Sequence, residues 1–144
     1  DVIRHANRNE IRDVITQYSV EGLERMRVIA SKDYQTNIGS FLPTGCSSAT
    51  SVSGYIDMSG GGVGEFKNVS TDKLCSEVGN LNDGECEKLK MPSRNSTTPF
   101  FYREVTLTPV QNDCNKVRVA VSVGIPGDVK YEDTDIVLYG YLAP

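Results

Sequence analysis

The sequence holds few of the residues that carry catalysis. Its 144 residues include one histidine, His5, no tryptophan, and no CxxC pair among four cysteines. Ser, Cys and Thr nucleophiles usually depend on a neighbouring base, and zinc sites need closely spaced Cys and His ligands. Because His5 stands beside Arg4 in a polar segment, we expect it to be solvated. We therefore expect no enzyme activity, no zinc site and no bound cofactor.

A basic cluster and a long apolar run are also missing. The 15 Lys and Arg and 19 Asp and Glu give a formal charge of −4, spread along the chain. Nucleic acid is therefore not expected as a partner, because phosphate binding needs a concentrated positive patch. The stretch from Val117 to Ile125 contains Arg118 and is shorter than the ~18 apolar residues that cross a bilayer. Without an initiating Met or a signal sequence, we expect a chain processed or trimmed ahead of Asp1.

The four cysteines favour a structural role. Cys46, Cys75, Cys86 and Cys114 are even in number, which in a chain of this size predicts two disulfide bonds formed in an oxidising compartment. Free buried thiols in a cytosolic protein are the alternative. Three pairings are possible. We favour Cys75 with Cys86 and Cys46 with Cys114, although the spacing alone does not fix the pairing.

Residues 1–31 predict a long amphipathic helix. Gly22 is the only Gly or Pro in this segment, and apolar residues recur three or four positions apart. The first nine residues are polar, so we expect that end to project from the globular body. Gly22 costs up to about 1 kcal/mol relative to Ala in a helix, which usually implies close packing or a bend. The apolar stripe comprises Ile11, Ile15, Tyr18, Met26 and Ile29.

Residues 32–98 form a region rich in Gly, Ser, Thr, Asn and Pro. Val52 to Met58 and Val63 to Val69 flank a glycine-rich turn, a pattern that predicts a β-hairpin. A short helix is predicted over Lys73 to Val78. The segment from Asn80 to Thr98 has almost no periodicity, so we expect a surface loop there.

Residues 99–144 contain three strand patterns separated by turn residues. The clearest runs from Val117 to Val123, where valines alternate with Arg118, Ala120 and Ser122. Three such strands predict an antiparallel meander, and the N-terminal helix is the long element available to cover its apolar face. We therefore predict a single α+β domain over residues 1–144. In it, an N-terminal amphipathic helix packs on an antiparallel β-sheet of three to five strands.

Three clusters have both a structural and a functional interpretation. The aromatic run from Phe100 to Tyr102, with Tyr139 and Tyr141, is expected in the sheet core rather than on a binding surface. Gly60 to Gly64 lacks the Lys-Ser/Thr of a phosphate cradle, so we expect a turn. The carboxylates of residues 83–85 and 132–135 are expected to be solvated in turns, with calcium at Asp133 and Asp135 as the alternative.

Two parts of the chain resemble a known family. The helix segment Glu21-Gly22-Leu23-Glu24-Arg25-Met26-Arg27 is similar to the Glu-Gly-Ile-Glu-x-Val-Arg pattern that ends the first helix of many minor pilins. The segments Phe101 to Val105, Val117 to Val123 and Val137 to Ala143 resemble the closing strands of type IV pilin-like proteins. The leader-peptidase site and apolar membrane helix of that family are not in the sequence. A chain that begins just after the membrane helix would explain their absence.

The resemblance implies a non-enzymatic subunit, a minor pilin that takes part in assembly, priming or tip formation of a type IV pilus-like filament. It implies other pilin subunits as partners, an inner-membrane anchor before assembly, and a place in a bacterial surface filament or the periplasm. We expect the contacts to involve Arg4, Arg8, Glu10 and Arg12 of the helix and the loop from Asn80 to Thr98. The alternatives are a minor pseudopilin of type II secretion, an extracellular adhesin or binding module, and a small secreted hydrolase using loop carboxylates.

Overall fold

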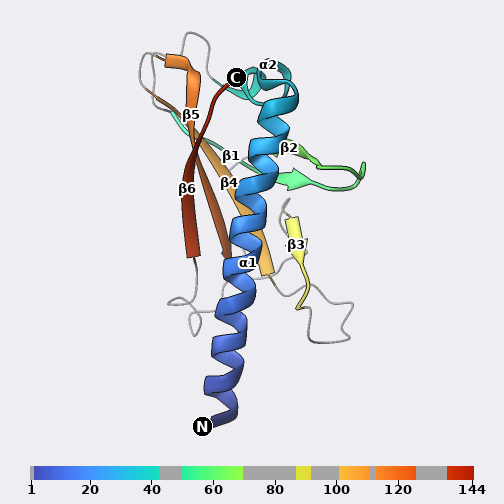
Figure 1. The fold of residues 1–144 in the computed structure, drawn as a ribbon, viewed down its shortest axis with the longest axis vertical. Coiled ribbons are helices and arrows are strands. Elements are labelled where there is room, and N and C mark those ends of the chain that lie inside the picture. The colour runs from blue at the N-terminus through green and yellow to red at the C-terminus, as the bar shows by residue number, and fades with distance from the viewer. Residues whose placement is uncertain (1, 43–49, 70–86, 92–100, 111–112, 126–135) are drawn as a thin grey trace.

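The computed structural model describes residues 2–42, 50–69, 87–91, 101–110, 113–125 and 136–144, with only the backbone described for residues 2–8, 114 and 136. The described chain is an α+β arrangement in which one long helix lies along one face of an antiparallel sheet (Figure 1). Its elements are α1 (Val2–Lys32), α2 (Tyr34–Asn37), a 3₁₀ turn (Gly39–Phe41), β1 (Val52–Asp57), β2 (Glu65–Asn68), β3 (Glu87–Leu89), β4 (Phe101–Val110), β5 (Asp113–Gly124) and β6 (Ile136–Leu142).

The long helix is confirmed, with bounds one residue from those predicted. Its buried side chains follow helical spacing, because residues three or four apart share one face. Ser19 is also buried on this face, and its hydroxyl donates a 2.8 Å hydrogen bond to the Ile15 carbonyl, which satisfies the polar group inside the helix. After α1, the Asp33 side chain caps α2 by accepting a hydrogen bond from the Thr36 amide. The buried residues of α1 include Ile11, Val14, Ile15, Met26 and Ile29.

The sheet has the order β2-β1-β4-β5-β6, and β3 pairs with β4 off this path. All the recorded pairings are antiparallel, and the predicted meander is confirmed as β4-β5-β6. The predicted range of three to five strands is wrong, because six strands are described. The unexpected strand is β3, which lies within the segment from Asn80 to Thr98 that was expected to be a loop. Three residues are too few to show the alternation that identifies a strand.

The predicted hairpin in the middle region is confirmed, with shorter strands. β1 and β2 pair from Gly54 with Asn68 to Asp57 with Glu65. The connection contains Gly61 and Gly62, whose φ angles of 75° and 66° are in the left-handed region that glycine tolerates best. The hairpin is tied to the end of the helical region by Phe41, whose ring meets that of Phe66 edge-on at 5.0 Å between centroids.

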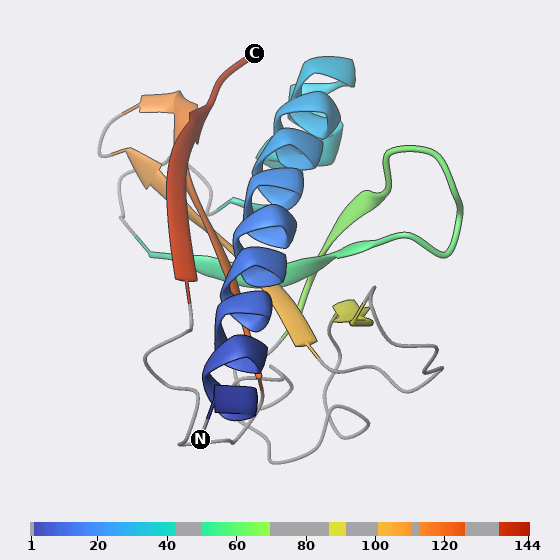
Figure 2. The same cartoon turned by 60° about the horizontal axis from the view of Figure 1, so that its bottom comes forward.

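Figures 1 and 2 both show α1 lying across one face of the sheet, and the buried apolar side chains of these elements form the core. The valines predicted to face the helix, from Val117 to Val123, are fully buried at alternate positions. Each such side chain contributes about 1.5–3 kcal/mol when removed from water. Gly22 lies at the closest approach, because a Cβ there would come within 2.9 Å of the Arg103 and Val121 side chains. Close packing is therefore the reason for a glycine in mid-helix.

The aromatic residues divide between the core and the surface. Phe101 and Tyr102 are buried, as predicted, but Tyr139 and Tyr141 are 61% and 58% exposed, so the expectation that they lie in the core is wrong. The reason is strand alternation, since Tyr139 pairs with Ala120 on the face of the sheet opposite the helix.

Candidate functional site

The predicted interaction residues lie on the N-terminal half of α1. In Figure 1 this end of the helix extends beyond the ends of the described strands. Arg12 is exposed and Glu10 is half-buried. The side chains of Arg4 and Arg8 are outside the described part, as is that of His5. The helix therefore carries Arg12 into solvent, and the predicted contact role of Arg4, Arg8, Glu10 and Arg12 stays a prediction.

The outer face of α1 combines paired charges with exposed valines. Arg25 donates to Glu21 at 2.9 Å and Arg27 to Glu24 at 2.6 Å. Val20 and Val28 are 49% and 38% exposed. Exposed ion pairs of this kind contribute about 0.3–0.5 kcal/mol each to the helix. The face of α1 opposite the sheet therefore carries both charged and apolar side chains.

A buried arginine joins three elements on the covered side of the sheet. Arg103 of β4 is 1% exposed and donates through Nε and Nη2 to the two carboxylate oxygens of Glu87 in β3, at 2.7 and 2.6 Å. Its Nη1 donates to the Tyr18 carbonyl of α1 at 2.9 Å and approaches Glu21 at 3.5 Å. We call these four residues the Arg103 cluster. This bidentate geometry is the strongest form of an arginine–carboxylate contact.

The two carboxylates of the Arg103 cluster have opposite pKa shifts. Burial raises the pKa of Glu87, and the hydrogen bonds and charge of Arg103 offset this only in part. Burial also acts on Glu21, but the hydrogen bonds and charges of Arg25 and Arg103 outweigh it, so the pKa of Glu21 is lowered. Burial likewise raises the pKa of Tyr18, whose hydroxyl donates to the Lys90 carbonyl at 2.7 Å. The cluster therefore links α1, β3 and β4.

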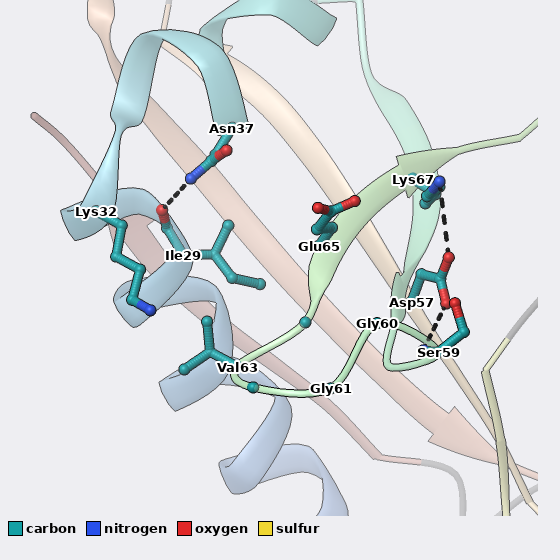
Figure 3. A pocket seen from close by; sticks show the side chains of 12 residues that line it. Ile29, Lys32, Asn37, Asp57, Ser59, Gly60, Gly61, Val63, Glu65 and Lys67 are labelled. Carbon is teal, nitrogen blue, oxygen red and sulfur yellow. Dashed lines mark hydrogen bonds and ion pairs between the residues drawn. The ribbon is translucent and has the colours of Figure 1, made fainter.

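A pocket of about 370 Å³ lies between the end of α1 and the β1–β2 hairpin. Figure 3 shows Ile29 and Lys32 on the helix side, and Val63 and the glycines of the turn on the other. Asn37 donates a 3.0 Å hydrogen bond to the Ile29 carbonyl at its rim. The remaining walls come from the hairpin strands and turn: Asp57, Ser59, Gly60, Gly61, Gly62, Gly64, Glu65 and Lys67.

The Asp57 carboxyl at this pocket has a lowered pKa. The backbone amide of Ser59 donates to Asp57 at 2.9 Å and, with the nearby Lys67, lowers the pKa of that carboxyl. A carboxyl with a lowered pKa is a poor proton donor near neutral pH. No group of three or more His, Cys, Asp or Glu residues that could hold a metal occurs in the described ranges. The glycine run acts here as a turn.

Several predictions fall on residues outside the described ranges. These are the calcium alternative at Asp133 and Asp135, the disulfide pairings of Cys46, Cys75 and Cys86, and the helix over residues 73–78. Cys114 lies in β5, but its side chain is not described. The calcium alternative, the disulfide pairings and the short helix therefore stay predictions.

Two features of the structure were not predicted from the sequence. Arg103 shares the alternation of Val105 and Leu107, so its inward direction could have been inferred from strand parity. Its partner Glu87 lies in a strand of three residues and gave no signal. The exposure of Tyr139 and Tyr141 follows from the same parity rule once β6 is paired with β5.

Comparison with known proteins adds no relative. No protein-family model, no curated protein and no solved structure matches this chain. Within the described residues, no helix is long and apolar enough to span a membrane. The long helix packed on an antiparallel sheet is compatible with a pilin-like fold.

Proposed function

We propose that this chain is the globular part of a non-enzymatic structural subunit, a minor pilin, in a type IV pilus-like filament. The observation that carries the proposal is the placement of α1. Its C-terminal two thirds pack on the sheet, while its N-terminal end runs past the described strands (Figure 1). A helix that packs on the sheet at its C-terminal part and extends past the strands at its N-terminal part is suited to join a globular head to a bundle of neighbouring helices.

The sequence resemblance supports the same proposal. The segment from Glu21 to Arg27 lies where α1 contacts the sheet, and its Gly22 gives the space that Arg103 needs. The closing meander lies where the resemblance expects it, as β4, β5 and β6. On this proposal the partners are other pilin subunits and the site of action is the bacterial surface or periplasm. The mechanism is assembly rather than turnover.

The first test uses native material. Surface filaments are sheared from the source cell, and the intact mass and N-terminal sequence of the protein are measured. We expect about 25–30 additional, mainly apolar residues ahead of Asp1, enough for a membrane helix, and a processed, N-methylated start. A native chain that begins at or near Asp1 and is released free into the medium would contradict the proposal.

The second test concerns the helix surface. Reversing Arg8 and Arg12 to Glu in the full-length protein should reduce filament counts without lowering the melting temperature of the domain. The matched control reverses Lys32 and Lys67, which are exposed, lie outside both predicted contact regions and carry the same total charge. Normal filament counts in the Arg8/Arg12 variant would exclude this surface. Normal pili with failed protein secretion would instead assign the subunit to a secretion pseudopilus.

A further inference from the structure

The face of β6 opposite the helix carries an uncovered apolar row. Val137, Tyr139 and Tyr141 occupy alternate positions and are 43%, 61% and 58% exposed. Single exposed apolar residues are common on protein surfaces, whereas large contiguous apolar patches mark interaction sites. We call this row, together with Lys116 and Arg118 of β5, the tyrosine edge.

Two cations lie on the rings of the tyrosine edge. The Lys116 Nζ is 4.8 Å from the centroid of the Tyr141 ring, and the Arg118 guanidinium carbon is 5.3 Å from that of Tyr139. Arg118 pairs with Tyr141 in the ladder, so its side chain crosses diagonally and its charged end lies above β6. Neither cation has a carboxylate within ion-pair distance in the described part of the chain.

β6 is also the last strand of the sheet as far as the chain is described. It pairs with β5 on one side, and no strand pairs with its other side in the described ranges. An edge strand presents backbone N–H and C=O groups that can pair with an extended chain. On the sheet face beside Arg118 and Tyr141, toward residues 108–110 of β4, lies a hollow of about 230 Å³. The edge thus offers backbone hydrogen bonds, apolar surface and positive charge in one place.

We propose that the tyrosine edge binds an extended, acidic peptide segment of a partner protein, which adds to the sheet alongside β6. Alternate side chains of such a segment repeat at about 6.6–6.8 Å, the spacing of Val137, Tyr139 and Tyr141 along β6. Its carboxylates meet Arg118 and Lys116, which present positive charge at this edge although the chain as a whole carries −4. This inference does not rest on the filament role, because it concerns the sheet edge and not α1.

The test is an NMR titration of the ¹⁵N-labelled chain with a capped peptide of alternating Glu and Val, seven residues long like β6. We expect saturable shifts of the β6 backbone amides below about 1 mM peptide, and weaker binding as salt is raised. The double reversal Lys116→Glu/Arg118→Glu should weaken binding by about tenfold or more. Lys88→Glu/Lys90→Glu, with the same net charge, should leave it unchanged. A second variant, Tyr139→Ser/Tyr141→Ser, should weaken binding without reversing charge.

Three further probes separate the proposal from its rivals. A Lys-Val peptide should cause no shifts, and N-methylation of alternate amides in the Glu-Val peptide should abolish binding if strand pairing is required. Equal binding by the Lys116/Arg118 variant, or no β6 shifts at all, overturns the proposal. So does binding of a polygalacturonate oligomer in place of the peptide. Self-association through β6 in sedimentation, lost in the same variant, would identify a second copy as the occupant and also overturn it.

Discussion

The two faces of the sheet contain the same kinds of residue, but these residues differ in burial. On the face toward α1, Val119 and Val121 are fully buried and even an arginine, Arg103, is 1% exposed. On the opposite face the side chains of Tyr139 and Arg118 are exposed to solvent and form a cation–π contact with each other. Residue type alone therefore does not separate core from surface in this sheet. In β5 and β6 the position within the strand alternation does, whereas in β4 Tyr102 and Glu104 are buried on the opposite face as well.

The largest effect on stability is expected from removing the buried positive charge of Arg103, on the face of the sheet that α1 covers. Arg103→Ala should lower the free energy of unfolding by about 3–5 kcal/mol, because it leaves Glu87 buried without its partner. Urea denaturation measures the loss. The double variant Arg103→Met/Glu87→Gln should recover part of it. A loss below about 1 kcal/mol would show that the Arg103 cluster is not a stabilising contact.

A smaller loss is expected where α1 approaches the sheet most closely. Gly22→Ala should destabilise the protein by about 1–3 kcal/mol, because the new Cβ comes within 2.9 Å of Arg103 and Val121. Gly60→Ala is the matched control, since a Cβ there meets nothing within 4 Å. Thermal melts of the two variants compare a crowded glycine with an open one. Equal stability of both variants would contradict the close packing.

The pH dependence sharpens the comparison within the Arg103 cluster. Glu87 has a raised pKa, so the stability that it contributes is present below its ordinary value of 4.5 and declines as pH rises through the higher folded pKa. Glu21 has a lowered pKa, so its contribution is present above 4.5 and declines as pH falls through the folded pKa. Relative to wild type, Glu87→Gln and Glu21→Gln should therefore change stability with opposite pH slopes. Denaturant midpoints over this range measure them, and slopes of equal sign would contradict the assignment.

The smallest effect on stability is expected at the tyrosine edge. Tyr139→Ser/Tyr141→Ser should change the free energy of unfolding by no more than about 0.5 kcal/mol per site, because both rings are largely exposed. Leu107→Ala on the covered face should cost about 2–5 kcal/mol in the same assay. Similar losses for the two variants would remove the distinction between the faces.

Much of the fold could be predicted because its signals are long. The helical spacing of Ile11 to Ile29 and the alternation of Val117 to Val123 extend over many residues. β3 could not be predicted from three residues, and the contact of Arg103 with Glu87 depends on where that strand pairs. The exposed tyrosines were assigned to the core because aromatic residues usually are buried, although their parity in β6 places them outside. In these cases the pairing of the strands, rather than the propensity of the residues, decides which side chains are buried.

The place of β4 in the sheet has a consequence for how the chain folds. It pairs with β1, β3 and β5 and packs against α1, so it joins the early and late parts of the sequence. During synthesis α1 emerges before the strands that bury its apolar stripe. Contacts of such large sequence separation slow folding, because a long loop must close before they form. The apolar face of α1 therefore remains exposed until these strands are synthesised. During that time, aggregation or chaperone binding competes with packing of α1 on the sheet.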